Sequence, residues 1–186
     1  MATYSDNFNR ADEAPIAGDW ATSLGIGIRI EGNEVRGRLG SCASVVNAQT
    51  FNDTQSAQVT FASFGAPQEA GVIVRGDLSG NGYILYKQSG NLRLRKITAG
   101  SETSLTSTAA TIVAGDTLRL EVSGTTLKAF VNSTQIGSDI TDSTYSSGKV
   151  GVIFKETSTR IDNFTAEGLV AATAITDVDG DDTVVD

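Results

Sequence analysis

The sequence predicts an all-β protein, an antiparallel β-sandwich or jelly roll of about a dozen strands with no major helix. Apolar and polar side chains alternate over short runs, which is the period of a half-buried strand. Turns built from Gly, Asn, Asp and Ser separate these runs at intervals of about 8–12 residues. No segment with a helical period is longer than two turns.

The two ends of the chain share a motif. Asp6-Asn7-Phe8 recurs as Asp162-Asn163-Phe164 within the run 159–165. The run 149–154 before it alternates apolar side chains with Gly and Ile, as a strand does. We therefore expect the first strand, 4–8, to pair with the last, 159–165, and to close one sandwich.

The strands between them follow from the same alternation. Gly32-Asn33 separates 26–31 from 34–38, which is a strong hairpin signal. The polar segment 98–111 contains only a weak strand near 103–105. The lone Trp20 is predicted to fill the core. The remaining expected strands are 42–48, 57–64, 70–75, 83–88, 91–97, 117–123, 126–132 and 134–138.

Composition limits the domain count and the chemistry. The 186 residues suit one domain, 1–169, followed by an acidic linker or tail, 170–186, which contains five Asp and no Lys or Arg. The single cysteine, Cys42, excludes an internal disulfide and is expected to be buried. There is no histidine, so the usual general base is missing. The body is too nearly balanced in charge for nucleic acid to be the main partner. No apolar run is long enough to span a membrane, and the first ten residues lack a signal-peptide pattern.

The opening SDNFNRADEAPIAGDWAT resembles the start of concanavalin A-like lectin/glucanase (LamG-like) jelly-roll domains. The runs GVIVRGDLSGNGYILYKQSGNLRLRKI and TLRLEVSGTTLKAFVN, followed by GKVGVIF and IDNFTAEG, resemble their central and C-terminal strands. The resemblance spans roughly residues 4–167. It implies a fold that serves glycan binders, adhesion modules, glycosidase and lyase scaffolds, and accessory domains of bacteriophage virion proteins.

The resemblance does not extend to a catalytic motif. Glucanases of this fold carry Glu-x-Asp-x-x-Glu on one strand, which places the acids on one face for glycoside cleavage. No strand of this chain has that pattern, and the missing histidine excludes a Tyr/His lyase centre. We therefore expect a protein that is not an enzyme.

A calcium ion is implied by the resemblance, because many of these jelly rolls hold one Ca²⁺ between their terminal strands. Asp6 and Asp162 are the candidate ligands, although both could instead bond neighbouring backbone amides. The tail run DVDGDD partly imitates an EF-hand loop, but its glycine comes one place early and no Glu follows at position twelve. A solvated linker is the simpler interpretation of that run.

Glycan binding requires aromatic platforms beside polar side chains. Tyr83, Tyr145, Arg93 and Arg95 are the candidate residues. Tyr83 and Tyr86 lie three apart on one strand and must face opposite sides, so at most one of them can join an external patch. Four arginines at positions expected to face outward could form a basic stripe on one sheet, or could simply pair with acids on neighbouring strands: Arg75, Arg93, Arg95 and Arg119.

These observations predict a noncatalytic structural or binding module, a bacteriophage virion accessory protein such as a capsid decoration, head fibre or tail component, with possible glycan binding. The alternative is a carbohydrate-binding or glycan-cleaving module of a glucanase- or lyase-like enzyme. Expected partners are glycan and other virion or surface proteins, in an oligomer or larger assembly. The expected location is the virion; a secreted or cell-surface location, within a longer protein, is the alternative.

Overall fold

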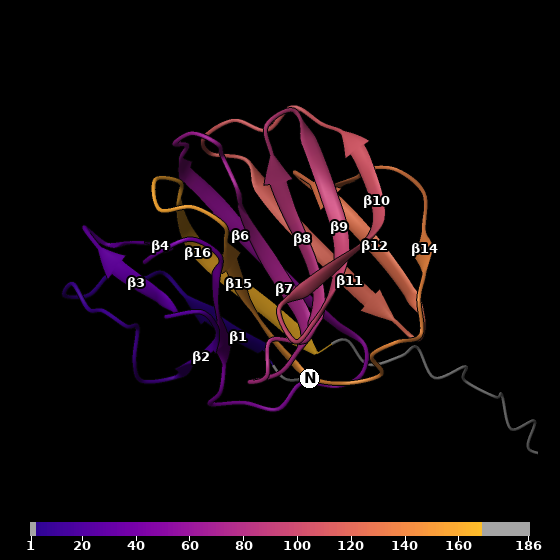
Figure 1. Cartoon of the computed structure of the whole chain (residues 1–186), viewed down its shortest axis with the longest axis horizontal. Helices are drawn as coiled ribbons and strands as arrows, with labels where there is room; N and C mark the ends of the chain where they lie inside the picture. Colours follow the sequence, from indigo (N-terminus) through magenta and orange to yellow (C-terminus); the bar gives the residue numbers. More distant parts are fainter. Residues whose placement is uncertain (1–2, 169–186) are drawn as a thin grey trace, which may run out of the picture.

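The computed structural model describes residues 3–168, which form two antiparallel sheets without a helix (Figure 1). The larger sheet has nine strands: β1 (Thr3–Asp6), β3 (Ile28–Glu31), β4 (Glu34–Gly37), β6 (Gln55–Ser63), β11 (Thr117–Ser123), β12 (Thr126–Val131), β13 (Thr134–Gln135), β14 (Ile140–Thr141) and β16 (Arg160–Gly168). The smaller sheet has seven: β2 (Trp20–Leu24), β5 (Cys42–Val46), β7 (Ala70–Gly76), β8 (Gly82–Gln88), β9 (Asn91–Thr98), β10 (Ser101–Ala109) and β15 (Lys149–Phe154). Within this part of the chain, no helix could cross a membrane.

The predicted pairing of the chain ends is confirmed. Strand β1 pairs antiparallel with β16, and Asp6 lies opposite Phe164. Strand β6 runs along the other side of β16, so the C-terminal strand is held from both sides. The two Asp-Asn-Phe motifs therefore meet in the larger sheet.

The predicted alternation also defines the core. In β15 the side chains of Val150, Val152 and Phe154 are fully buried between the sheets. Strand β11 contributes Leu118 and Leu120 from the opposite sheet. Since each strand of a sandwich has one inner and one outer face, this pattern is the direct consequence of a two-residue period.

Strand β10 is longer than the sequence predicted. It extends over Ser101–Ala109, where only a weak strand near 103–105 was expected. Its Ser- and Thr-rich sequence has no clear apolar period, but the whole strand pairs with β9, with one irregularity between Ser104 and Thr106. Pairing with an existing neighbour therefore determines this strand, rather than its own pattern. Strand β2, which begins at Trp20, and the short β14 were not predicted either. The strand predicted over 134–138 exists as the shorter β13, and residues 3–168 contain sixteen strands in all.

The prediction that Arg75 faces outward is wrong. Its side chain is only 3 % exposed. The guanidinium donates to the backbone oxygens of Asp53 (2.6 Å) and Tyr145 (2.6 Å), so Arg75 fastens two loops to the end of β7. The backbone of Arg75 has a φ of 51°, which takes its side chain out of the regular alternation of the strand.

Two other predictions about single residues are confirmed: Trp20 is 4 % exposed and Cys42 is fully buried. The predicted hairpin exists as β3 and β4. The acidic segment 170–186, including the run that imitates an EF-hand, lies outside the described residues.

Candidate functional site

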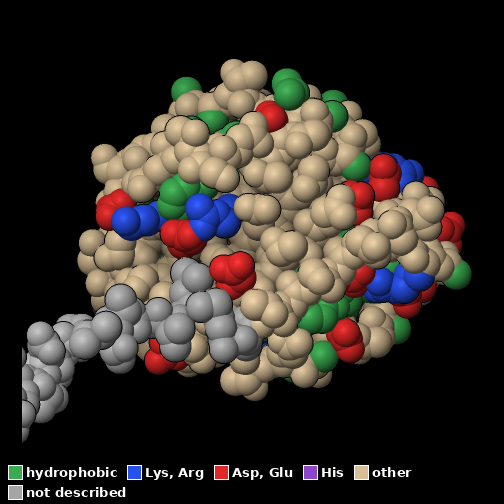
Figure 2. Space-filling model, turned by 180° about the vertical axis from the view of Figure 1, so that it is seen from behind, with side chains coloured by type: hydrophobic (Ala, Val, Ile, Leu, Met, Phe, Trp, Pro, Cys, Tyr) green, Lys and Arg blue, Asp and Glu red, His purple; other side chains and the backbone are tan. Residues whose placement is uncertain are grey.

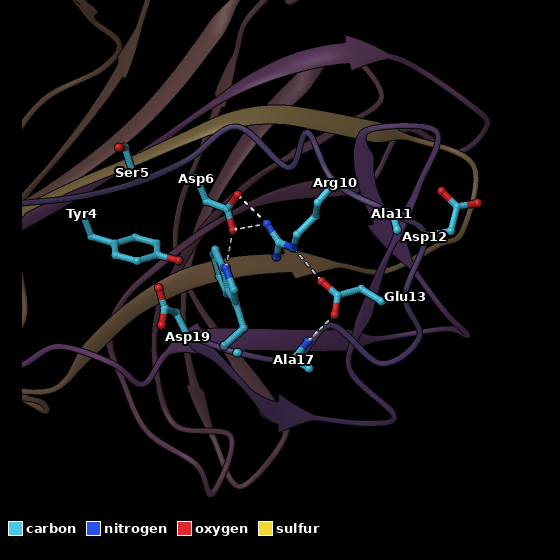
Figure 3. Close-up of a pocket in the computed structure, with 11 residues that line it drawn as sticks. Tyr4, Ser5, Asp6, Arg10, Ala11, Asp12, Glu13, Ala17 and Asp19 are labelled. Carbon is cyan, nitrogen blue, oxygen red and sulfur yellow. Dashed lines mark hydrogen bonds and ion pairs between the residues drawn. The ribbon is translucent and has the colours of Figure 1, made fainter.

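A pocket of about 610 Å³ opens where β1, the loop that follows it and the start of β2 meet (Figure 3). Its lining combines one arginine, four acids and two aromatic residues with small side chains: Tyr4, Ser5, Asp6, Arg10, Ala11, Asp12, Glu13, Ala17, Gly18, Asp19 and Trp20. All of these belong to the first twenty residues, so a single stretch of sequence builds the pocket.

Asp6 organises the wall of this pocket. One carboxylate oxygen accepts the backbone N–H of Phe8 (2.8 Å), and the other accepts the indole N–H of Trp20 (2.8 Å). The guanidinium of Arg10 bonds both oxygens, at 2.8 and 3.0 Å. The bond to Phe8 forms a tight turn directly after β1, where Phe8 takes a φ of 53°.

Arg10 continues the network along the loop. Its Nε donates to Glu13 at 2.7 Å, and the second oxygen of Glu13 accepts the backbone N–H of Ala17 (3.2 Å). Arg10 thus engages both Asp6 and Glu13, so neither carboxylate stands free to protonate a leaving group. This arrangement fixes the loop, and it does not resemble a pair of carboxylates facing each other across a cleft.

Tyr4 and Asp19 lie on the same side of the pocket (Figure 3). The Tyr4 ring is half-buried and packs edge-on against Trp20, with ring centres 6.0 Å apart. Burial, together with the negative charges of Asp6 and Asp19, raises the pKa of the Tyr4 hydroxyl well above its ordinary value. The hydroxyl is protonated at neutral pH, as in an ordinary tyrosine, and is able to donate. The Asp19 carboxylate is exposed, and its backbone is held because its carbonyl accepts the N–H of Asn47 (2.7 Å).

These groups can recognise a polyol. A half-buried aromatic ring offers an apolar surface to the C–H face of a sugar. The Tyr4 hydroxyl supplies a donor, and the Asp19 carboxylate supplies acceptors for sugar hydroxyls. The pocket therefore has the mixture of groups that sugar recognition requires.

The candidate calcium ligands do not fit a cation in this arrangement. Asp6 already accepts four hydrogen bonds, two of them from the positively charged Arg10. Asp162 accepts the backbone N–H (2.7 Å) and the side-chain amide (2.8 Å) of Asn163. Calcium requires six to eight oxygen ligands, and residues 3–168 contain no cluster of three or more acidic, Cys or His side chains able to hold a metal. Both carboxylates instead bond the backbone of their own turns.

The four residues predicted for glycan binding do not form one site, because Tyr83 and the two arginines lie on opposite faces. Tyr83 is fully buried, so its ring has no free face for a sugar. Its hydroxyl donates to Asp142 (2.7 Å) and accepts the backbone N–H of Tyr145 (3.1 Å). The Tyr145 hydroxyl donates to the carbonyl of Ile97 (2.8 Å). Tyr83 and Tyr145 therefore hold the loop that precedes β15 against β8 and β9.

Arg93 and Arg95 lie on the outer face of the smaller sheet. Arg95 pairs with Glu102 of β10 at 3.2 Å, and Glu102 also binds Lys155 and the Tyr86 hydroxyl. As the three-residue spacing predicted, Tyr86 belongs to this outer cluster and Tyr83 to the core. Tyr86 is only 1 % exposed, because the charged side chains cover it.

The basic stripe, one of the two arrangements considered for the arginines, is not formed by Arg75, Arg93, Arg95 and Arg119. Arg93 and Arg95 belong to the smaller sheet, whereas Arg119 lies on the larger one, beside Glu121. On the face shown in Figure 2, Lys and Arg side chains lie beside Asp and Glu rather than in a row of one charge. The alternative, pairing with acids on neighbouring strands, is confirmed for Arg95, which pairs with Glu102 of β10. Arg119 pairs with Glu121 of its own strand, β11.

Comparison with known proteins supports the fold but does not establish the function. No family model matches the chain, and no curated protein matches it by sequence. Among solved structures, the chain is similar to the carbohydrate-binding module CBM66 from Bacillus subtilis, with a TM-score of 0.61 and 16 % identity over 78 % of this chain and 91 % of that one. The fold is a concanavalin A-like jelly roll.

Other solved structures with this fold differ in what they do. The exoplasmic/lumenal domain of VIP36, in a Ca²⁺/Man3GlcNAc-bound form, has a TM-score of 0.61 and 12 % identity over 84 % of this chain and 86 % of that one. The Crh5 transglycosylase has a TM-score of 0.62 and 10 % identity over 91 % of this chain and 85 % of that one. At these identities the likeness extends to the fold alone, so function has to be argued from the pocket.

The sequence pointed to other residues than those that line the pocket. Of the lining residues, only Asp6 and Trp20 were considered: Asp6 as a calcium ligand, and Trp20 as a core residue or, less favoured, as an aromatic contact for a sugar. The sequence did contain a signal for this site. The loop 9–19 carries several acids and one arginine, which are more charged residues than a connection between two strands requires.

Proposed function

We propose that this chain is a noncatalytic glycan-binding module and that its ligand site is the pocket beside β1. The observation that carries the proposal is the combination of the half-buried Tyr4 ring with its neutral hydroxyl and the exposed Asp19 carboxylate, in a hollow of about 610 Å³. Pockets of about 300–1,000 Å³ with a few convergent polar groups are typical of small-ligand sites. Solved lectin-like structures of the same fold support the proposal at the level of the scaffold.

Two of the four carboxylates of the pocket, Asp6 and Glu13, are arranged for binding rather than cleavage. Arg10 engages Asp6 and Glu13 together, whereas glycoside cleavage needs one carboxyl group that holds a proton and a second that attacks or activates water. A noncatalytic role is therefore our proposal, although a transglycosylase shares the fold.

The proposal is tested by screening the protein against a glycan array and measuring the affinity of the best neutral glycan by calorimetry. We expect Tyr4→Ala and Asp19→Asn each to weaken binding by at least about tenfold, which corresponds to the loss of one good contact. Asp53→Asn is the matched control, because Asp53 is an exposed acid outside the pocket. Full affinity in both pocket variants would contradict the site, and glycan turnover by the wild-type protein would contradict the noncatalytic role.

A virion accessory role is the biological setting that we propose for such a module. Its support is the resemblance of the sequence to accessory domains of bacteriophage virion proteins. Sizing with light scattering tests the expected oligomer, and immunogold electron microscopy of particles from the natural source tests the setting. Gold labelling away from particles would contradict it.

A further inference from the structure

A second pocket, of about 530 Å³, lies at one end of the sandwich, between the turns that follow β6, β8 and β10. Pro67, Gln68, Ser89, Thr111 and Ile112 line it together with Lys87. None of these residues belongs to the first pocket. The lining offers amide and hydroxyl groups beside a small apolar surface.

Lys87 is the charged group of this pocket, and it is only 4 % exposed. Its Nζ donates to the amide oxygen of Gln68 (2.5 Å) and to the backbone oxygen of Ser89 (2.5 Å). The ammonium also lies 4.9 Å from the centre of the Phe64 ring. Its donors are therefore occupied by neutral groups.

The charge of Lys87 is not balanced within residues 3–168, where no carboxylate lies within 4.0 Å of it. By contrast, Lys96, Lys128 and Lys155 each pair with an acid. Buried charges in proteins are normally paired, because an unpaired charge is costly to remove from water. Burial accordingly lowers the pKa of Lys87.

The two acceptors come from different turns. Ser89 is the first residue of the two-residue turn between β8 and β9, and its φ of 51° is the positive value that such a hairpin turn requires. Gln68, with a φ of 67°, lies in the turn that follows β6. Two separate turns therefore each direct one oxygen at the same ammonium.

We propose that this second pocket binds a ligand that carries a single carboxylate and is about the size of a monosaccharide, such as a uronic acid. The carboxylate takes the place of the Gln68 amide oxygen on Lys87 Nζ, and the ring lies between Thr111 and the apolar surface of Pro67 and Ile112. One ammonium matches one carboxylate in charge. The displaced Gln68 amide and the Ser89 and Thr111 hydroxyls are available to the sugar hydroxyls.

This inference is independent of the first pocket, and the experiment separates the two. Glucuronate, glucose and acetate are titrated into the wild-type protein by calorimetry, and the same titrations are repeated on variants. We expect glucuronate to bind at least tenfold more tightly than glucose or acetate, because both the carboxylate and the ring contribute. Lys87→Met should weaken glucuronate binding at least tenfold, whereas Tyr4→Ala should leave it unchanged.

Gln68→Glu provides a second test that does not depend on removing the lysine. A glutamate at this position places a carboxylate where the amide oxygen lies, so it imitates the ligand from within. We expect it to abolish glucuronate binding and to raise the melting temperature by about 2–4 °C, the shift typical of a modest stabilisation in a chain of this size. Gln68→Ala removes the internal competitor and should bind glucuronate at least as tightly as the wild type.

Three results would overturn the proposal. The first is the absence of glucuronate binding in both the wild type and Gln68→Ala. The second is binding that persists in Lys87→Met or Gln68→Glu. The third is binding that is lost in Tyr4→Ala, which would assign glucuronate to the first pocket and leave the proposed function standing.

Discussion

The indole nitrogen of Trp20 donates a hydrogen bond to a carboxylate oxygen of Asp6 over 2.8 Å, and this bond joins the two sheets. Trp20 begins β2 in the smaller sheet, and Asp6 ends β1 in the larger one. The Trp20 ring also packs against Phe164 of β16, with centres 5.0 Å apart. A single aromatic residue therefore closes the sandwich at the point where the first pocket opens.

We expect Asp6→Ala to lower the free energy of unfolding by about 2–3 kcal/mol, the usual cost of losing hydrogen bonds to a buried charged group. The substitution leaves the Trp20 indole, the Phe8 N–H and the Arg10 guanidinium without their shared acceptor. Urea denaturation monitored by tryptophan fluorescence measures the change. Asp162→Ala is the matched control, because Asp162 bonds only to its neighbour Asn163 in the described structure.

The control should lose about 0.5 kcal/mol or less, the usual range of surface substitutions. Equal losses in the two variants would show that Asp6 has no special role in joining the sheets.

Calcium should have no effect on stability. The lone pairs of Asp6 are occupied by N–H donors, and Arg10 repels a cation. A ligand that binds only the folded state at one hundred times its dissociation constant would stabilise it by about 2.7 kcal/mol. We therefore expect the same melting temperature in millimolar CaCl₂ and in EDTA. A rise of several degrees in calcium would restore the metal site predicted between the terminal strands.

The sequence predicted those features that depend on period and on turn chemistry. The alternation of Val150, Val152 and Phe154 identified the buried face of β15, and Gly32-Asn33 identified the hairpin of β3 and β4. Both signals are local, so a single stretch of residues contains all the information. The pairing of β1 with β16 required a relationship between distant residues, and the repeated Asp-Asn-Phe motif provided it.

The sequence could not predict features that depend on neighbours in space. Strand β10 has no strong period of its own and forms against β9. Arg75 occupies a position that alternation places outside, but two loops supply the carbonyls that hold its side chain inside. Lys87 looked like an ordinary strand residue, and only the turns that surround it show that it is buried.

Gly71 should not tolerate a side chain. A Cβ at this position would lie 2.0 Å from the carbonyl oxygen of Leu85 and 2.6 Å from the Cα of Tyr86, and both are backbone atoms that cannot move aside. We expect Gly71→Ala to lower the free energy of unfolding by about 3 kcal/mol or more, or to prevent folding, because β7 and β8 would have to separate. Solubility on expression and circular dichroism measure the outcome.

Gly90→Ala is the control for this substitution, since a Cβ there would meet no atom within 4 Å and the residue has no positive φ. It should change stability by less than about 0.5 kcal/mol. A fully stable Gly71→Ala protein would contradict the close approach of β7 and β8.

Acid should weaken the clamp formed by Asp142 with Tyr83, Lys96 and Thr144, which holds the loop before β15. Burial disfavours the charge of Asp142, but hydrogen bonds from Thr144, Tyr83 and Lys96 outweigh it and hold the pKa of this carboxyl well below its ordinary value of 3.8. Because the pKa is lower in the folded state, the unfolded state binds a proton more readily. The stabilisation is therefore complete when the pH is above the ordinary pKa of an aspartate, and it is lost as the pH falls through the lower pKa of Asp142 in the folded state.

Urea denaturation between pH 7 and pH 2 tests this prediction. We expect Asp142→Asn to be less stable than the wild type at neutral pH and to lose less stability below pH 4. Asp53→Asn, which alters an exposed acid outside the clamp, should follow the wild-type curve. Parallel curves for Asp142→Asn and the wild type below pH 4 would show that another carboxyl group carries the acid sensitivity.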